Sequence, residues 1–275
     1  LGSVRDINSS VFVRQASLGN PNLKSASSTN YNLGFIYQFK ATTLSLDLWE
    51  IDYENRIEVE SAQAILSSNP NGPSVTRNEF GDLIGVSTTY FNEENTFISG
   101  IDFQFEYLME ISKGDLSINI MGTSLTDFLT PSLNSPNKMI NRIGKFNFDN
   151  HVHSLPKKRI NSFINWSYKN FVLGFSTRYI DGYKNEREIT GLGLTYGYQN
   201  TVKSFLVHDI SLKASKGNLS YSIYLSNLLD KSAPRLYDAP DFSFDTRVHD
   251  PRGRILGLNI GSVSYTHLTL PTKLA

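Results

Sequence analysis

The sequence offers few groups of residues that could carry out chemistry. His151 and His153 form an HxH pair, and Asp149 lies two residues before it. Imidazole and carboxylate groups at such spacing could serve as zinc ligands. The pair lies in a long polar stretch, however, and two imidazoles without a fixed third ligand are more typical of a solvated loop.

The acidic pair Asp102 and Glu106 is no better suited to acid–base catalysis. Strand geometry separates residues at this spacing by roughly 13 Å, which is too far for a glycosidase pair acting from one strand. His208 alternates with apolar residues, which indicates a structural or interfacial position on a strand. No GxSxG, HExxH or phosphate-binding glycine loop is present. We therefore expect no enzyme activity, no metal site and no cofactor.

The amino-acid composition limits the classes of binding partner and the ways in which the chain could cross a membrane. The 26 basic and 26 acidic side chains give a formal net charge of zero, and no basic arm or patch suits nucleic acid. Apolar runs such as residues 171–173 are far shorter than the roughly 20 residues that a membrane-spanning helix needs. If the chain crosses a membrane, it does so as strands.

Period-two alternation is the main structural signal, and residues 96–109 show it most clearly. The apolar side chains there fall on one face of a strand and the polar ones on the other. The apolar set is Phe97, Ile101, Phe103, Phe105, Tyr107 and Met109, and the polar set is Gly100, Asp102, Gln104 and Glu106.

The same alternation recurs along most of the chain and predicts about nine strands. Further segments are 30–39, 43–48, 159–168, 171–179 and 219–226, with weaker ones at 116–125, 205–214 and 254–260. No segment has a convincing helical period. After Leu48 the apolar residues change parity, which indicates either a bulge or passage out of the membrane into an aqueous rim.

The connections alternate between short and long. Tight polar turns are expected at 40–42, 110–114, 169–170 and 216–217, and long polar stretches at 58–95, 128–158, 184–203 and 229–253. Long loops without structure are uncommon in compact soluble domains. Short periplasmic turns and long extracellular loops are the asymmetry of outer-membrane barrels. This alternation of short and long connections therefore favours a barrel whose last strand ends on the periplasmic side.

Six local motifs resemble the barrel of TonB-dependent receptors, in family order. They lie at 19–34 (GNPNLKSASSTNYNLG), 69–107 (beginning NPNGPSVTRNEFG and ending SGIDFQFEY), 154–166 (SLPKKRINSFINW), 178–185 (RYIDGYKN), 226–234 (SNLLDKSAP) and 250–261 (DPRGRILGLNIG). The first motif departs from the family, because Ser25 and Ala26 stand where a Pro-Glu pair is usual.

The resemblance implies an all-β fold: an antiparallel transmembrane β-barrel of 22 strands with an N-terminal plug. About nine strands make a partial barrel, and nothing in the chain resembles the plug or the TonB box. No leader is visible at Leu1, so either it was removed or the chain is a fragment, and the strand count favours a fragment. We expect residues 1–28 to be an extracellular loop segment leading into the barrel, 29–261 to be C-terminal barrel strands with long extracellular loops, and 262–275 to be a non-native tail similar to translated adapter sequence.

The resemblance also implies a bacterial outer-membrane receptor that takes up a scarce nutrient, whether siderophore, cobalamin, oligosaccharide or peptide. Its partners would be outer-membrane lipid, its own plug, the TonB complex acting through the plug, and the small ligand. On this interpretation Asp102, Gln104, Glu106, Asn161, Asn165 and Arg178 face the lumen and the plug. Ligand contacts from the extracellular loops would come from Asn71, Arg77, Asp82, Tyr90, Arg187, Tyr196 and Tyr198.

Two other classes of protein remain open. A passive porin-like barrel would have a constriction loop and a regular run of charges on the lumen face, which the sequence carries only in patches. A soluble extracellular β-sandwich adhesin would have shorter and more even connections, and a second sheet would cover its apolar faces.

Overall fold

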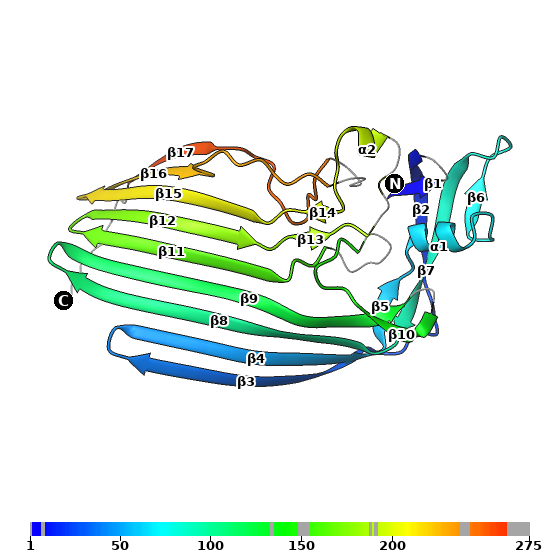
Figure 1. Ribbon diagram of the computed structural model, residues 1–275, viewed down its shortest axis with the longest axis horizontal. Helices are drawn as coiled ribbons and strands as arrows, with labels where there is room; N and C mark the ends of the chain where they lie inside the picture. Colours follow the sequence, from blue (N-terminus) through cyan, green and yellow to red (C-terminus); the bar gives the residue numbers. More distant parts are fainter. Residues whose placement is uncertain are drawn as a thin grey trace, which may run out of the picture.

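The computed structural model describes residues 2–6, 9–132, 135–147, 154–186, 189, 192–236 and 243–262. The largest sheet of the described residues is antiparallel, and we call it the wall (Figure 1). Its strands, from one edge to the other, are β17 (Ile255–Ser262), β16 (Leu219–Ser226), β15 (Phe205–Lys216), β12 (Phe171–Ile180), β11 (Lys158–Tyr168), β9 (Gly114–Ser132), β8 (Thr96–Ile111), β4 (Thr42–Glu54) and β3 (Ser27–Phe39). β10 (Ser135–Asn141) pairs with the end of β9. Within the described ranges, the nine-strand path confirms the predicted strands.

Tight turns join the strands at one end of the wall, on the left in Figure 1. Lys40 and Lys169 have φ values of 50° and 54°, and Gly114 and Gly217 have φ values of 98° and 58°. Two-residue hairpins need such left-handed residues, because their twist matches that of the strands. Gly114 is also required by space, since a Cβ there would lie 1.9 Å from the Ser167 carbonyl oxygen. All four predicted short turns are present.

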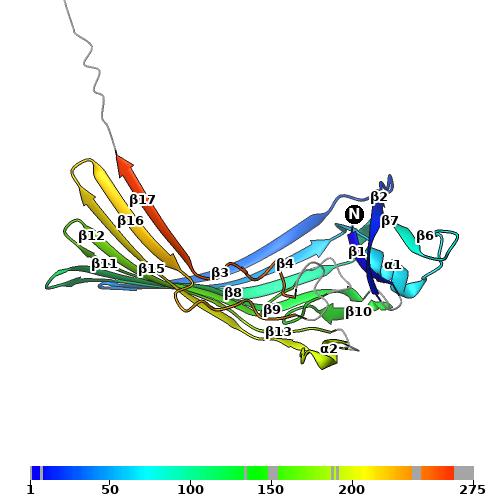
Figure 2. The ribbon, with the colours of Figure 1, turned by 90° about the horizontal axis from the view of Figure 1, so that it is seen from above.

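The apolar face of the wall is left exposed. Leu33, Phe35 and Tyr37 on β3 are 69%, 58% and 51% exposed, and Leu46 on β4 is 39% exposed. The wall is a single curved layer (Figure 2), and within the part of the chain that is described no second sheet covers this face. The arrangement excludes the β-sandwich, whose apolar faces would be buried against each other.

The change of parity after Leu48 is not a bulge in β4. β4 pairs with β3 and β8 without interruption from Thr42 to Tyr53, so Trp49 lies on the polar face of the wall. Its ring covers Gly100, where a Cβ would lie 2.4 Å from Cζ2 of the tryptophan. The register shift occurs instead in β9, where Thr126 is the extra residue opposite Ser99 and Gly100.

A second sheet lies at the other end of the wall, on the right in Figure 1. It contains β1 (Gly2–Asp6), β2 (Ser9–Leu18), β7 (Leu83–Glu93) and β5 (Arg56–Val59) in this order, and β6 (Val75–Arg77) pairs with β7. We call it, together with α1 (Ala62–Ser68), the loop sheet. Ser61 caps α1, because its hydroxyl accepts the backbone N–H of Ala64 at 3.2 Å. Much of 1–28 and 58–95, expected as loop, is therefore regular structure.

The two apolar cores of the described residues both lie outside the middle of the wall. The first belongs to the loop sheet and contains Val4, Val13, Ala62, Leu66, Leu83 and Val86. The second, which we call the loop core, contains Phe146, Tyr183, Val202 and Leu236. It lies beside the short pair β13 (Tyr183–Lys184) and β14 (Thr201–Val202) and near α2 (Leu192–Thr195). Among the described residues, no helix is long and apolar enough to cross a membrane.

The core of the loop sheet should be sensitive to truncation where α1 packs. Leu66 is 3% exposed, and Leu66→Ala leaves a cavity that should cost about 2–4 kcal/mol. Hydrogen exchange of β1, β2 and β7 amides should speed up by about 30-fold or more. Ile84→Ala, at a position 49% exposed in the same sheet, is the matched control and should change exchange little. Equal effects of the two changes would show that α1 does not hold this sheet.

Candidate lumen and ligand sites

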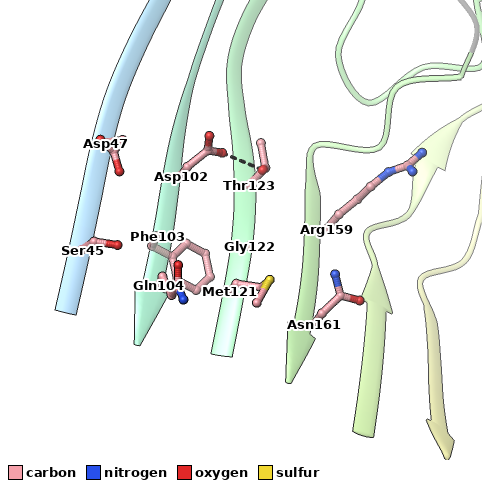
Figure 3. Close-up of a pocket in the computed structure, with 10 residues that line it drawn as sticks. All are labelled: Ser45, Asp47, Asp102, Phe103, Gln104, Met121, Gly122, Thr123, Arg159 and Asn161. Carbon is pink, nitrogen blue, oxygen red and sulfur yellow. Dashed lines mark hydrogen bonds between the residues drawn. The ribbon is translucent and has the colours of Figure 1, made fainter. Parts of the chain in front are cut away.

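A hollow of about 400 Å³ opens on the polar face of the wall (Figure 3). Asp47 on β4 lies directly opposite Asp102 on β8, and like charges placed so repel each other. The two carboxylates turn apart. Asp102 accepts the Thr123 hydroxyl at 2.6 Å, and the carboxylate of Asp47 leans over Gly34, where a Cβ would lie 2.7 Å from its Oδ1.

A second group of polar side chains follows on the same face. The amide Nε2 of Gln104 donates to Glu106 at 2.7 Å, and Nδ2 of Asn119 donates to the same carboxylate oxygen at 2.9 Å. Gln104 and Glu106 are therefore joined by a hydrogen bond on this face, whereas Asp102 is bonded to Thr123 instead. Within the described residues, no cation lies within ion-pair distance of Asp102 or Glu106.

The other predicted lumen residues lie across the hollow on β11 and β12. Asn161 lines the hollow and pairs in register with Arg178, while Asn165 lies opposite Gly174. Arg178 forms an ion pair with Asp209 at 3.3 Å. This side of the face thus balances its own charge, unlike the strip around Asp102.

Sequence reasoning missed several residues of this face: Asp47, Asn119, Thr123 and Arg159. Asp47 alternates with the apolar residues of 43–48, so its face could have been predicted. Its position beside Asp102 could not, because the register between β4 and β8 depends on pairing of distant segments.

Arg77, one of the expected ligand contacts, is occupied by protein acceptors. Its two terminal nitrogens hold Asp6 at 2.8 and 2.9 Å, and further hydrogen bonds reach the carbonyls of Pro70 and Gly81 and the side chain of Asn71. The hydrogen bond from Arg77 holds the pKa of Asp6 below its usual range. Arg77 therefore ties β1 to the 70–81 segment.

The remaining loop candidates have different surroundings. Asp82 accepts the side-chain amide of Asn78 at 3.0 Å, and Tyr90 on β7 is 40% exposed. Tyr196 and Tyr198 line a second hollow of about 370 Å³ near α2. Arg187 lies outside the described residues.

Of the histidines that we expect to be non-catalytic, some lie among the described residues and some do not. His151, His153 and Asp149 lie outside the described residues. His208 shares a 2.9 Å hydrogen bond with the Thr177 hydroxyl and stacks on Phe175 with ring centroids 5.5 Å apart. Within the described ranges, no group of three His, Cys, Asp or Glu side chains could hold a metal ion.

A buried cluster of polar side chains connects the loops at the end of the wall away from the short turns. Asp245, 3% exposed, accepts hydrogen bonds from the hydroxyls of Ser154 and Tyr183. His249, also 3% exposed, stacks on Tyr183 and meets Phe205 edge-on. Among the described residues neither of its ring nitrogens has a hydrogen-bond partner. Burial lowers the pKa of His249 to about 4, with the charge of Asp245 opposing the shift and that of Arg159 adding to it.

Comparison with known proteins gives one family and several solved structures. The family model described as TonB dependent receptor-like, beta-barrel, matches residues 5–228. No curated protein sequence is significantly similar.

The similar structures are bacterial receptors and a transporter. The siderophore receptor PirA of Acinetobacter baumannii superposes with a TM-score of 0.58 at 17% identity, over 89% of this chain and 32% of that one. The ferric enterobactin receptor of Pseudomonas aeruginosa (Q482A mutant, with enterobactin) gives 0.58 at 15%, over 89% and 32%. The FrpB iron transporter of Neisseria meningitidis gives 0.53 at 11%, over 90% and 32%. The superpositions show a shared fold, and the chain spans about a third of the length of these structures.

The buried His249 makes the loop cluster sensitive to acid. Its pKa is about 4 in the folded loops and about 6.5 once exposed, so protons bind preferentially to the opened state. Stability is complete above about pH 6.5 and should fall by about 3 kcal/mol as the pH drops towards 4. Hydrogen exchange of residues 243–249, corrected for intrinsic rates, measures this loss.

His249→Phe is the matched control, because it keeps the ring between Tyr183 and Phe205 and removes the titration. The loss of protection between pH 6.5 and 4 should shrink in this variant. An equal loss with phenylalanine would assign the acid sensitivity to other groups.

Proposed function

We propose, since this chain belongs to the TonB-dependent receptor-like β-barrel family, that it forms part of a bacterial outer-membrane receptor for TonB-energised uptake of a scarce nutrient. A ferric siderophore is the first cargo to test, because two of the similar structures are siderophore receptors and one is an iron transporter. Cobalamin, oligosaccharide and peptide are the alternative cargoes.

The exposed apolar face of the wall is the observation that carries the proposal. The wall strands alternate apolar and polar residues over much of their length, yet Leu33, Phe35 and Leu258 remain 69%, 58% and 70% exposed. A contiguous apolar surface of this kind is unfavourable in water. Outer-membrane lipid would cover it, and the hydrogen bonds between strands would satisfy the backbone there.

The polar face would then line the lumen. We assign contacts with the plug to Asp102, Gln104, Glu106, Asn161, Asn165 and Arg178. The carboxylates of Asp102 and Glu106 support this assignment, because they lack a cationic partner among the described residues. A guanidinium or ammonium group from a segment inside the barrel would neutralise them.

The mechanism involves no chemical change of the cargo. The outer loops capture the ligand, and TonB, driven from the inner membrane, moves the plug to open a path. In this scheme Tyr90, Arg187, Tyr196 and Tyr198 contact the ligand directly. Asn71, Arg77 and Asp82 contribute by fixing the shape of the 70–82 segment, as the hydrogen bonds of Arg77 suggest.

Transport can be tested in cells with and without TonB. Cells that lack their own siderophore receptors and express the full-length receptor that contains this chain should accumulate iron-labelled enterobactin, and deletion of TonB should abolish accumulation. Uptake that persists without TonB would favour the passive porin. If neither ferric siderophores nor the three alternative cargoes are taken up, the receptor function is refuted.

Two adjacent positions on β4 test the membrane orientation. Leu46 lies on the apolar face, and Leu46→Arg should destabilise the protein in lipid vesicles by about 2–4 kcal/mol, as arginine does near the bilayer midplane. Ser45 borders the polar hollow, so Ser45→Arg should cost far less. Urea titration followed by the mobility of folded protein on gels measures both. A larger cost at Ser45 would reverse the assignment of the two faces.

A further inference from the structure

The hollow near α2 carries an unusual set of side chains. It is lined by the cations Lys203, Lys231 and Arg235 and by the rings of Tyr196 and Tyr198, and no carboxylate is among its lining residues. We propose that this hollow is an anion-binding site for a ligand that carries two or more negative charges on a planar ring system. The inference rests on the proposed function insofar as the occupant is taken to be the cargo.

The loop core holds the two sides of the hollow together. Val202 and Leu236, 2% and 1% exposed, belong to the same buried cluster. Lys203 follows Val202 directly, and Arg235 precedes Leu236, so the anchored residues place their cationic neighbours at the hollow. The backbone N–H of Leu236 also donates to the carbonyl of Ser243 at 2.9 Å. Cations set beside anchored residues lose less conformational entropy when a ligand binds.

Aromatic contacts orient two of the cations. The guanidinium of Arg235 lies over the Tyr198 ring, 6.0 Å from its centroid, and the ammonium of Lys231 lies 5.7 Å from the centroid of Phe205. A guanidinium that lies over an aromatic ring keeps its N–H groups free to bind oxyanions that approach in the plane of the guanidinium group. The exposed ring of Tyr196 adds a flat apolar surface for stacking.

The lack of acidic partners distinguishes these cations from others at the same end of the molecule. Arg56 pairs with Glu93, Arg77 with Asp6 at 2.8 Å, and Arg252 with Asp250 at 2.7 Å. Within the described residues, Lys203, Lys231 and Arg235 have no carboxylate within ion-pair distance. Three like charges around one hollow repel each other, and an incoming polyanion relieves this repulsion.

Binding of pyranine, a pyrene ring with three sulfonates, tests the site directly. Fluorescence anisotropy on the protein purified in detergent should show binding that weakens as salt concentration rises. The combined change Lys203→Gln, Lys231→Gln and Arg235→Gln should weaken binding more than tenfold. A second variant, Tyr196→Leu with Tyr198→Leu, should weaken it severalfold while keeping the charges.

The control carries the same number of charge removals at the opposite end of the wall: Lys113→Gln, Lys169→Gln and Lys216→Gln, in the short turns. Its affinity for pyranine should match that of the unaltered protein. If both triple variants bind alike, or if the loop variant binds as well as the unaltered protein, the anion site is refuted. A protein that binds pyranine through the three loop cations but transports no cargo would refute the proposed function and leave the site in place.

Discussion

Backbone hydrogen bonding between neighbouring antiparallel strands is the interaction on which the rest of this structure depends. The described wall strands contain no apolar core in their middle, so side-chain packing against a second layer does not hold them. β3 pairs with β4 over thirteen residues, and β4 with β8 over twelve, without interruption. Such pairing satisfies every interior N–H and C=O group within the sheet, which is the condition for a polypeptide to lie in lipid.

This dependence on pairing leaves the side chains free to serve two different surroundings. One face presents leucine, tyrosine and phenylalanine side chains, and the other places Asp47, Asp102 and Gln104 around a polar hollow. The apolar cores instead lie among the loops at the end away from the short turns, where the loop core contains Val202 and Leu236 next to Lys203 and Arg235.

The strands and turns of the wall could be predicted from the sequence because their signals are local. Alternation of residues needs only one segment, and a tight turn such as that at Lys169 needs only two residues. The loop sheet could not be predicted, because β2 pairs with β7 in parallel across about 70 residues of chain. For the same reason the position of Asp47 opposite Asp102 could not be predicted. The parity change after Leu48 was compatible with a bulge in β4, but the structure has its bulge in β9.

In the proposed receptor the two faces of the wall meet lipid and water. Because the chain has no cysteine, single labelling sites can be introduced cleanly to test this. Spin labels at each position from 44 to 48, in the protein reconstituted into lipid vesicles, would report contact with dissolved oxygen in lipid and with a water-soluble paramagnetic reagent. We expect strict alternation over these five positions, with lipid contact at Leu44, Leu46 and Leu48 and water contact at Ser45 and Asp47. Uniform accessibility along β4, or lipid contact at Ser45 and Asp47, would contradict it.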